Sequence, residues 1–275
     1  MPELPETETI ARGLHRAVTG ARIARVSVPR PDVLRVASAA ALRRRAAGAR
    51  IARAWRRAKM VVLDLDSGDR IVVQPRFTGA LLVDDGALDD LERRRTAVAF
   101  ALDDGRVLRY ADVRRLGTVA LMTPAHWTAA ERALGPEPLD PGFTAVRLSG
   151  ILRGSRQAVK KLLMDQRKLA GIGNIYATEA LWRAGLDPSR PGRGIAAAEA
   201  DRLHEALTGV LREAVAARGT SFRDYRDAEG NRGEFAPRLA AYGRGGLPCP
   251  RCGARLVGTH AVDGRATVFC PRCQR

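Results

Sequence analysis

The change from strand-like to helical hydrophobic spacing between residues 122 and 144 constrains the fold more than any other feature of the sequence. Before residue 123, apolar residues form short or alternating runs typical of strands, at 21–28, 49–55, 60–65, 70–74, 80–83, 96–102, 106–110 and 117–122. After a proline-rich stretch, Gly135 to Gly142, the spacing becomes helical, over 144–152, 155–166, 174–184 and 196–217. We therefore expect an α+β protein in which residues 135–143 link two domains.

The first domain is expected to cover residues 1–134 and to be a β-sandwich of two antiparallel sheets with flanking helices. Asp66-Ser67-Gly68-Asp69 and Asp103-Asp104-Gly105 are hairpin-turn signals between its strands. A helix over 5–18 should precede them, because Ile10, Leu14 and Val18 fall on one face and Gly20 follows. The helical domain should then cover 144–240, with 218–240 as a mobile loop, and 241–275 a separate module.

That last module contains all four cysteines, as Cys249-Pro-Arg-Cys252 and Cys270-Pro-Arg-Cys273. Two such pairs can place four thiolates tetrahedrally around one zinc ion. Disulfides in a secreted tail are the alternative, but the chain has no secretion signal. We expect one structural Zn²⁺, because four protein ligands leave no position for a reactive water.

The N-terminal sequence Met1-Pro2-Glu3-Leu4-Pro5-Glu6 carries a candidate nucleophile. Removal of Met1 would leave the secondary amine of Pro2, which titrates well below a lysine and can form an iminium without a cofactor. Glu3 and Glu6 could then supply a proton and stabilise the developing cation. The alternative is an exposed leader before a helix, with Pro5 in its first turn.

A formal charge of +17 and a pI near 11.1 indicate a polyanionic partner. Arginine dominates this charge, since the only lysines are Lys59, Lys160, Lys161 and Lys168. The turn Gly171-Ile172-Gly173 before Asn174 could grip a phosphate at a helix start, or could simply join two packed helices. With no apolar run near about 20 residues and no leader, we expect a soluble, cytoplasmic protein.

Several motifs occur in a fixed order along the chain. They are Pro2-Glu3-Leu4-Pro5-Glu6-Thr7-Glu8-Thr9, Arg57-Ala58-Lys59, Asp165-Gln166 with Gly171-Ile172-Gly173-Asn174-Ile175-Tyr176, and Phe269-Cys270-Pro271-Arg272-Cys273-Gln274. Together they resemble the formamidopyrimidine-DNA glycosylase family from the first residue to the last. The resemblance implies a β-sandwich joined to a helix-two-turns-helix domain with a zinc finger.

The resemblance also implies roles for individual residues. Pro2 would attack the anomeric carbon of a damaged nucleotide, Glu3 would protonate the sugar ring oxygen, and Glu6 would support that site. Lys59 would reach the active site and an adjacent phosphate. Further phosphate contacts would come from Lys160, Asn174 and Arg265. The loop 219–233 would cover the everted base.

The chain departs from the family pattern where the gap left by an everted base is filled. The family commonly has His-Leu-Gly-Met-Ser-Gly where this chain has Gln74-Pro75-Arg76-Phe77-Thr78-Gly79. Phe77 would replace the methionine wedge, and Leu116 would replace a phenylalanine, while Arg114 is retained. Packing of Phe77 in the core is the alternative reading of this position.

The resemblance therefore implies a bifunctional glycosylase and lyase that removes oxidised purines from duplex DNA, as a monomer, in base excision repair. One alternative is an endonuclease VIII-like preference for oxidised pyrimidines. The other is a DNA-binding protein without catalysis.

Overall fold

The computed structural model describes residues 2–275, so Met1 lies outside the described part. The chain forms two compact units. Residues up to Arg132, together with Ala217–Ala236, form the first unit, and Ala133–Ala216 with Pro237–Arg275 form the second. Among the described residues, none of the helices has the length and apolar character needed to cross a bilayer.

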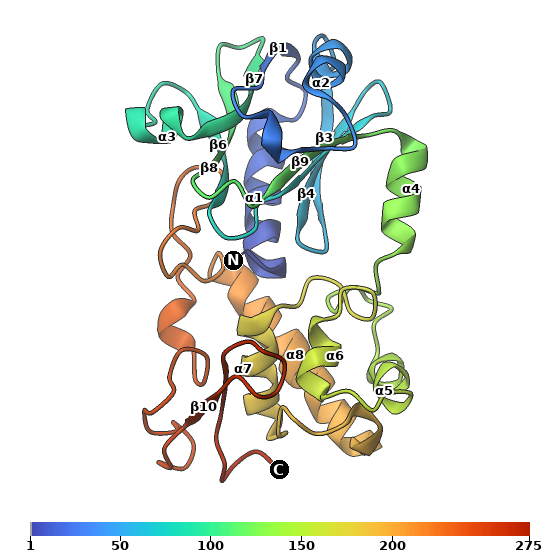
Figure 1. The fold of residues 1–275 in the computed structure, drawn as a ribbon, viewed down its shortest axis with the longest axis vertical. Coiled ribbons are helices and arrows are strands. Elements are labelled where there is room, and N and C mark those ends of the chain that lie inside the picture. Colours follow the sequence, from blue (N-terminus) through green and yellow to red (C-terminus); the bar gives the residue numbers. More distant parts are fainter. Residues whose placement is uncertain (1) are drawn as a thin grey trace. The chain divides into compact units, whose positions relative to one another are not determined.

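The first unit is a β-sandwich flanked by helices (Figure 1). One sheet has the order β1-β7-β8-β6 and the other the order β2-β9-β5-β4-β3. The helices are α1 (Leu4–Val18), α2 (Ala39–Ala46), α3 (Asp90–Arg94) and α4 (Pro124–Arg132). The strands are β1 (Ile23–Ser27), β2 (Leu34–Arg35), β3 (Ile51–Arg57), β4 (Met60–Leu65), β5 (Arg70–Gln74), β6 (Gly79–Asp84), β7 (Thr96–Leu102), β8 (Val107–Asp112) and β9 (Thr118–Met122).

The core of this unit lies between the sheets, because both contribute fully buried side chains to one apolar cluster. Phe100 and Leu108 come from one sheet, and Leu63 and Ile71 come from the other. Helix α1 adds Ile10, Leu14 and Val18, spaced to share one helix face. At about 25 cal/mol per Å² of apolar surface, this burial is what fixes α1 against the strands.

The second unit is helical with a small hairpin. It contains α5 (Ala145–Arg153), α6 (Val159–Met164), α7 (Asn174–Ala184) and α8 (Ala197–Ala216), and the strands β10 (Val257–Thr259) and β11 (Thr267–Phe269). Helix α7 packs on α8, α6 packs on α7, and β11 lies against α7. The left-handed conformation of Gly185 (φ +70°) ends α7, as expected for a glycine after a helix.

The eight predicted strands and the α+β class are confirmed. The prediction of two purely antiparallel sheets was wrong at one edge, where the two-residue strand β2 pairs parallel to β9. The short helices α2, α3 and α4 were not foreseen.

Two segments differ from their sequence-based description. The expected linker is packed, because Gly135 donates its N–H to the Gln166 carbonyl (2.8 Å) and the Pro136 carbonyl accepts from the Ala170 N–H (2.9 Å). Residues 217–236, expected with the helical domain, belong to the first unit, where the Thr220 N–H contacts Glu6.

Candidate active site

The first turn of α1 gathers the predicted catalytic residues in a buried position. Pro2 is buried, and Glu3 and Glu6 are each 1% exposed. The Glu6 carboxylate accepts the Glu3 N–H at 2.7 Å through one oxygen and the Thr220 N–H at 2.7 Å through the other. Glu6 therefore fixes the backbone of Glu3, next to the candidate nucleophile, and attaches the loop 217–236 to α1.

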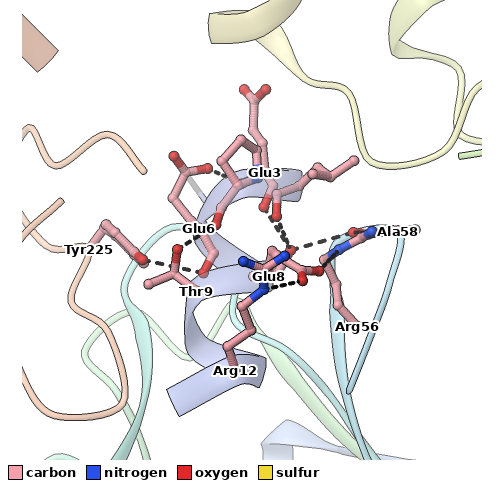
Figure 2. A network of polar contacts seen from close by, with 11 residues as sticks. Glu3, Glu6, Glu8, Thr9, Arg12, Arg56, Ala58 and Tyr225 are labelled. Atoms are coloured by element: carbon pink, nitrogen blue, oxygen red, sulfur yellow. Dashed lines mark hydrogen bonds and ion pairs between the residues drawn. The ribbon is translucent and has the colours of Figure 1, made fainter. Parts of the chain in front are cut away.

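Tyr225 strengthens this attachment from the loop side. Its hydroxyl oxygen lies 3.0 Å from the Arg218 carbonyl oxygen and 3.3 Å from that of Glu6. Figure 2 shows Tyr225 reaching Glu6 and Thr9 on α1. Burial raises the pKa of Tyr225 above its usual range, and the charge of Glu6 adds to the rise, so the phenol remains a neutral donor.

Glu8 joins α1 to the β3–β4 hairpin. It accepts hydrogen bonds from Arg12 Nε (2.6 Å) and Arg56 Nε (2.8 Å), as Figure 2 shows. Burial opposes ionisation of Glu8, but the charge and hydrogen bond of Arg56 outweigh it with help from Arg12, so the pKa of Glu8 lies below its usual value.

The tip of this hairpin positions Lys59. Ala58 has a left-handed backbone (φ +53°), and its carbonyl accepts from Arg56 Nη1 (3.1 Å) and from Thr7 Oγ1 (3.4 Å). These contacts bring the tip to the first turns of α1. Lys59, the next residue, is 8% exposed.

Phe77 and Arg114 lie on two neighbouring loops of the first unit, after β5 and after β8. The Arg114 guanidinium carbon lies 5.4 Å from the centre of the Phe77 ring, a cation–π arrangement. Phe77 is 47% exposed and Leu116 is 41% exposed. Phe77 is therefore not a core residue, which removes the alternative reading of that position.

Lys160 does not occupy the position expected for a phosphate ligand. Its side chain is fully buried, and Nζ donates to Thr267 Oγ1 (2.6 Å) and lies 3.4 Å from both the Ala266 carbonyl and Asp263 Oδ1. The prediction that Lys160 contacts a DNA phosphate is therefore corrected: its ammonium is buried and donates a hydrogen bond to Thr267 inside the second unit. Its neighbour Lys161 is exposed and lines a surface hollow with Arg167 and Arg265.

Asn174 and Arg265 are brought together within the second unit. Asn174 is the first residue of α7, and its Nδ2 donates to the Ala266 carbonyl at 2.9 Å. Its Oδ1 is buried and has no hydrogen-bond partner within residues 2–275. Gln166 stabilises the preceding turn by accepting the Gly171 N–H (2.9 Å) and donating to the Ile172 carbonyl (2.8 Å). Arg265 is exposed at the hairpin beside Ala266.

The four cysteine sulfurs lie within 4.8 Å of one another. Tetrahedral zinc–thiolate bonds of about 2.3 Å require sulfurs about 3.8 Å apart, so Cys249, Cys252, Cys270 and Cys273 fit one zinc ion. The Cys273 N–H points at the Cys270 sulfur (3.4 Å), a contact that stabilises a thiolate. The expected structural zinc site is confirmed by this geometry and by the family comparison below.

Sequence reasoning missed the partners that hold the site together. Tyr225 and the Thr220 N–H come from a loop that lies more than 200 residues from Glu6 along the chain. No sequence spacing connects these groups to α1. The available signal was the presence of aromatic residues, Tyr225 among them, in an otherwise polar loop.

Three family models together match most of the chain. The formamidopyrimidine-DNA glycosylase N-terminal domain matches residues 1–119, and the formamidopyrimidine-DNA glycosylase H2TH domain matches residues 134–226. A zinc finger found in FPG and IleRS matches residues 246–275.

Relatives and solved structures with the same family name align over nearly their whole length. A formamidopyrimidine-DNA glycosylase from Heliobacterium modesticaldum is 42% identical, with 100% of both chains covered. One from Moorella thermoacetica is 44% identical over 93% of each chain. The crystal structure of the MutM (Fpg) protein from Thermus thermophilus is 38% identical, with a TM-score of 0.87 and 99% and 98% coverage. The Lactococcus lactis Fpg in complex with DNA containing an abasic site is 28% identical, with a TM-score of 0.90 and 99% of both chains covered.

Proposed function

This chain belongs to the formamidopyrimidine-DNA glycosylase family, and on that premise we propose that it excises oxidised purines from duplex DNA and then cleaves the strand. Its substrates would be 8-oxoguanine and formamidopyrimidines, and its role base excision repair, as a monomer at the bacterial nucleoid. The observation that carries the proposal is the buried first turn of α1, where Glu6 holds the backbone of Glu3 beside Pro2.

Chemistry would begin at the Pro2 nitrogen once Met1 has been removed. The neutral amine nitrogen forms a bond to C1′ of the damaged nucleotide as the bond from C1′ to the base breaks, and the proton that the nitrogen loses neutralises the departing base. Glu3 then gives a proton to the ring oxygen, so that the sugar opens and an iminium remains on C1′. A general base then removes a proton from C2′, and the bond from the sugar to the 3′ phosphate breaks. A second elimination breaks the bond from the sugar to the 5′ phosphate.

The two loops after β5 and β8 would open the duplex. Phe77 would enter the gap left by the everted nucleotide, and Leu116 would pack beside it, which offsets the unstacking cost of a few kcal/mol. Arg114 would face the base left without a partner. The exposure of both Phe77 and Leu116 on these loops, where a duplex could reach them, supports this assignment.

Phosphates on either side of the lesion would be held by Lys59, Asn174 and Arg265. The exposed guanidinium of Arg265 and the helix-start position of Asn174 support their part. The structural zinc would hold the hairpin that carries Arg265, since a four-thiolate site supplies no reactive ligand.

Borohydride trapping tests the proposal. We expect the processed protein to become covalently attached to duplexes that contain 8-oxoguanine or an abasic site, and Pro2→Gly to lose base release by more than about 100-fold. Pro5→Ala is the matched control, because it alters a proline on the same turn but leaves the terminal amine. Unchanged base release by Pro2→Gly would refute the mechanism.

The same duplex panel separates the lesion classes. Faster excision of thymine glycol than of 8-oxoguanine would favour the pyrimidine-directed alternative. Tight binding without any adduct would indicate a protein that only binds damaged DNA. The mass of the intact chain would report whether Met1 has been removed.

A further inference from the structure

One buried carboxylate connects the two loops that carry Phe77 and Arg114. Asp112, the last residue of β8, is 4% exposed. Its Oδ1 accepts from Thr78 Oγ1 (2.5 Å) and from the Arg114 N–H (3.2 Å). Its Oδ2 accepts from the Gly117 N–H (2.8 Å) and from the Tyr110 hydroxyl (2.9 Å). Thr78 adjoins Phe77, so every one of these donors lies on or beside the two loops.

The two loops approach Tyr110 closely at two glycines. A methyl group at Gly117 would overlap the Tyr110 hydroxyl oxygen, and one at Gly79 would overlap the Pro75 carbonyl oxygen. Only glycine permits this approach of backbone to side chain. The loops therefore meet through polar contacts around Asp112 and through a close approach that a larger residue at Gly79 or Gly117 would disrupt.

Two residues in this region have left-handed backbones that non-glycine residues rarely adopt. They are Arg76 (φ +51°), directly before Phe77, and Arg115 (φ +52°), directly after Arg114. Each costs roughly 1–2 kcal/mol and persists only where surrounding contacts impose it. Thr78 also accepts the Arg114 N–H at 3.0 Å, which joins the loops directly.

We propose that Asp112 is a positioning residue that makes the Phe77 and Arg114 loops one rigid wedge before DNA arrives. This inference rests on the proposed function, in which those loops enter the duplex. A wedge that is already ordered does not lose side-chain and loop entropy when it replaces the everted nucleotide. Asp112 would thus act on the step that opens the duplex and not on the bond-breaking steps at Pro2.

The experiment measures duplex opening apart from chemistry. A duplex with 2-aminopurine opposite an 8-oxoguanine is mixed rapidly with protein, and the fluorescence rise reports loss of stacking. Asp112→Asn replaces one carboxylate oxygen with an NH₂ group, which cannot accept the hydrogen bonds that this oxygen receives. Thr78→Val removes the hydroxyl that donates to Asp112 and keeps the shape of the side chain. We expect each to slow the rise by about tenfold, the effect of one lost hydrogen bond.

Matched variants separate positioning from general stability. Asp84→Asn alters a carboxylate that is as buried as that of Asp112 but lies at the last residue of β6, away from the two loops. Asp84 accepts hydrogen bonds from Arg109 Nε (2.7 Å) and from the Gly86 N–H (2.9 Å). Asp84→Asn should lower thermal stability and leave the fluorescence rate unchanged. Thr78→Ser keeps the hydroxyl and should show the wild-type fluorescence rate. Because Asp112 and Thr78 share one hydrogen bond, the Asp112→Asn/Thr78→Val double variant should be little slower than either single variant.

Trapping on a single-stranded abasic oligonucleotide keeps this inference distinct from the proposed function. That substrate has no stacked partner strand to open, so Asp112→Asn and Thr78→Val should form adducts at the wild-type rate. Absence of wild-type adducts on the 8-oxoguanine and abasic duplexes would overturn the proposed function, whereas the fluorescence assay still tests the wedge because it requires only binding. A wild-type fluorescence rate in Thr78→Val, or an equal slowing in Asp84→Asn, would overturn the role of Asp112.

Discussion

Replacement of Glu6 by glutamine is the sharpest test of how the catalytic terminus is held. The carboxylate uses its two oxygens for two backbone donors, the Glu3 N–H and the Thr220 N–H, both at 2.7 Å. A glutamine keeps one acceptor and turns an NH₂ group toward the other donor. One buried N–H then loses its partner at a site where Glu6 is 1% exposed.

The expected cost follows from these contacts. A hydrogen bond to a charged acceptor contributes about 1.5–3 kcal/mol, and a buried donor without a partner adds a desolvation penalty. We expect Glu6→Gln to lower the free energy of unfolding by about 2–4 kcal/mol. If misalignment of Glu3 and Pro2 raises the activation free energy of excision by about 2 kcal/mol, excision should slow by about 30-fold.

Single-turnover excision of 8-oxoguanine at saturating protein measures the rate effect, and urea unfolding followed by tryptophan fluorescence measures stability. Asp84→Asn is the control, since it removes a buried carboxylate of the same unit whose donors lie on β8 and in the turn after β6. It should lose stability with little change in excision rate. A wild-type excision rate for Glu6→Gln, or an equal slowing by Asp84→Asn, would contradict the reasoning.

Three further predictions concern charge and metal. Against the effect of burial, Arg56 and Arg12 lower the pKa of Glu8, so its carboxylate stabilises the fold above the unfolded-state pKa near 4.3, and this contribution disappears as pH falls through the lower folded-state pKa. The stability gap between wild type and Glu8→Gln in urea titrations should therefore be present at pH 7 and narrow as the solution is acidified below about pH 4. Lys161→Ala should reduce duplex affinity and lower the salt slope by about one, whereas Lys160→Met should chiefly destabilise the second unit, as fluorescence anisotropy and thermal melts would show. Cys252→Ala should release the zinc, detected with a chromogenic chelator, and weaken duplex binding by more than tenfold (about 1.4 kcal/mol).

The regular elements were readable because their signals are local. The short apolar run at 97–102 and the helical spacing of Ile10, Leu14 and Val18 depend only on neighbours along the chain, and β7 and α1 appear where these patterns predict them. The short helices α2 and α3 carry weaker patterns, since α3 spans five residues and buries none of them. Parallel pairing of β2 with β9 depends on residues that are far apart in sequence and could not be read from either segment.

Lys160 and Lys161 show the limit of reasoning from residue type. The two lysines are adjacent and chemically identical, so the sequence offered no reason to prefer one as a phosphate ligand. The rotation of α6 decides the outcome: it turns Lys160 inward, where Thr267 accepts its hydrogen bond, and leaves Lys161 exposed.

By itself, the sequence determined the order of parts, the zinc ligands and the candidate nucleophile, because periodicity, cysteine spacing and a terminal proline are properties of short segments. Only the tertiary structure decided which groups hold that nucleophile, and the loops that carry Phe77 and Arg114, in place. The contact of Glu6 with Thr220 and that of Asp112 with Thr78 join segments that fold from different parts of the chain. Their hydrogen bonds exist only after both segments pack against a common core, so no pattern along the chain specifies them.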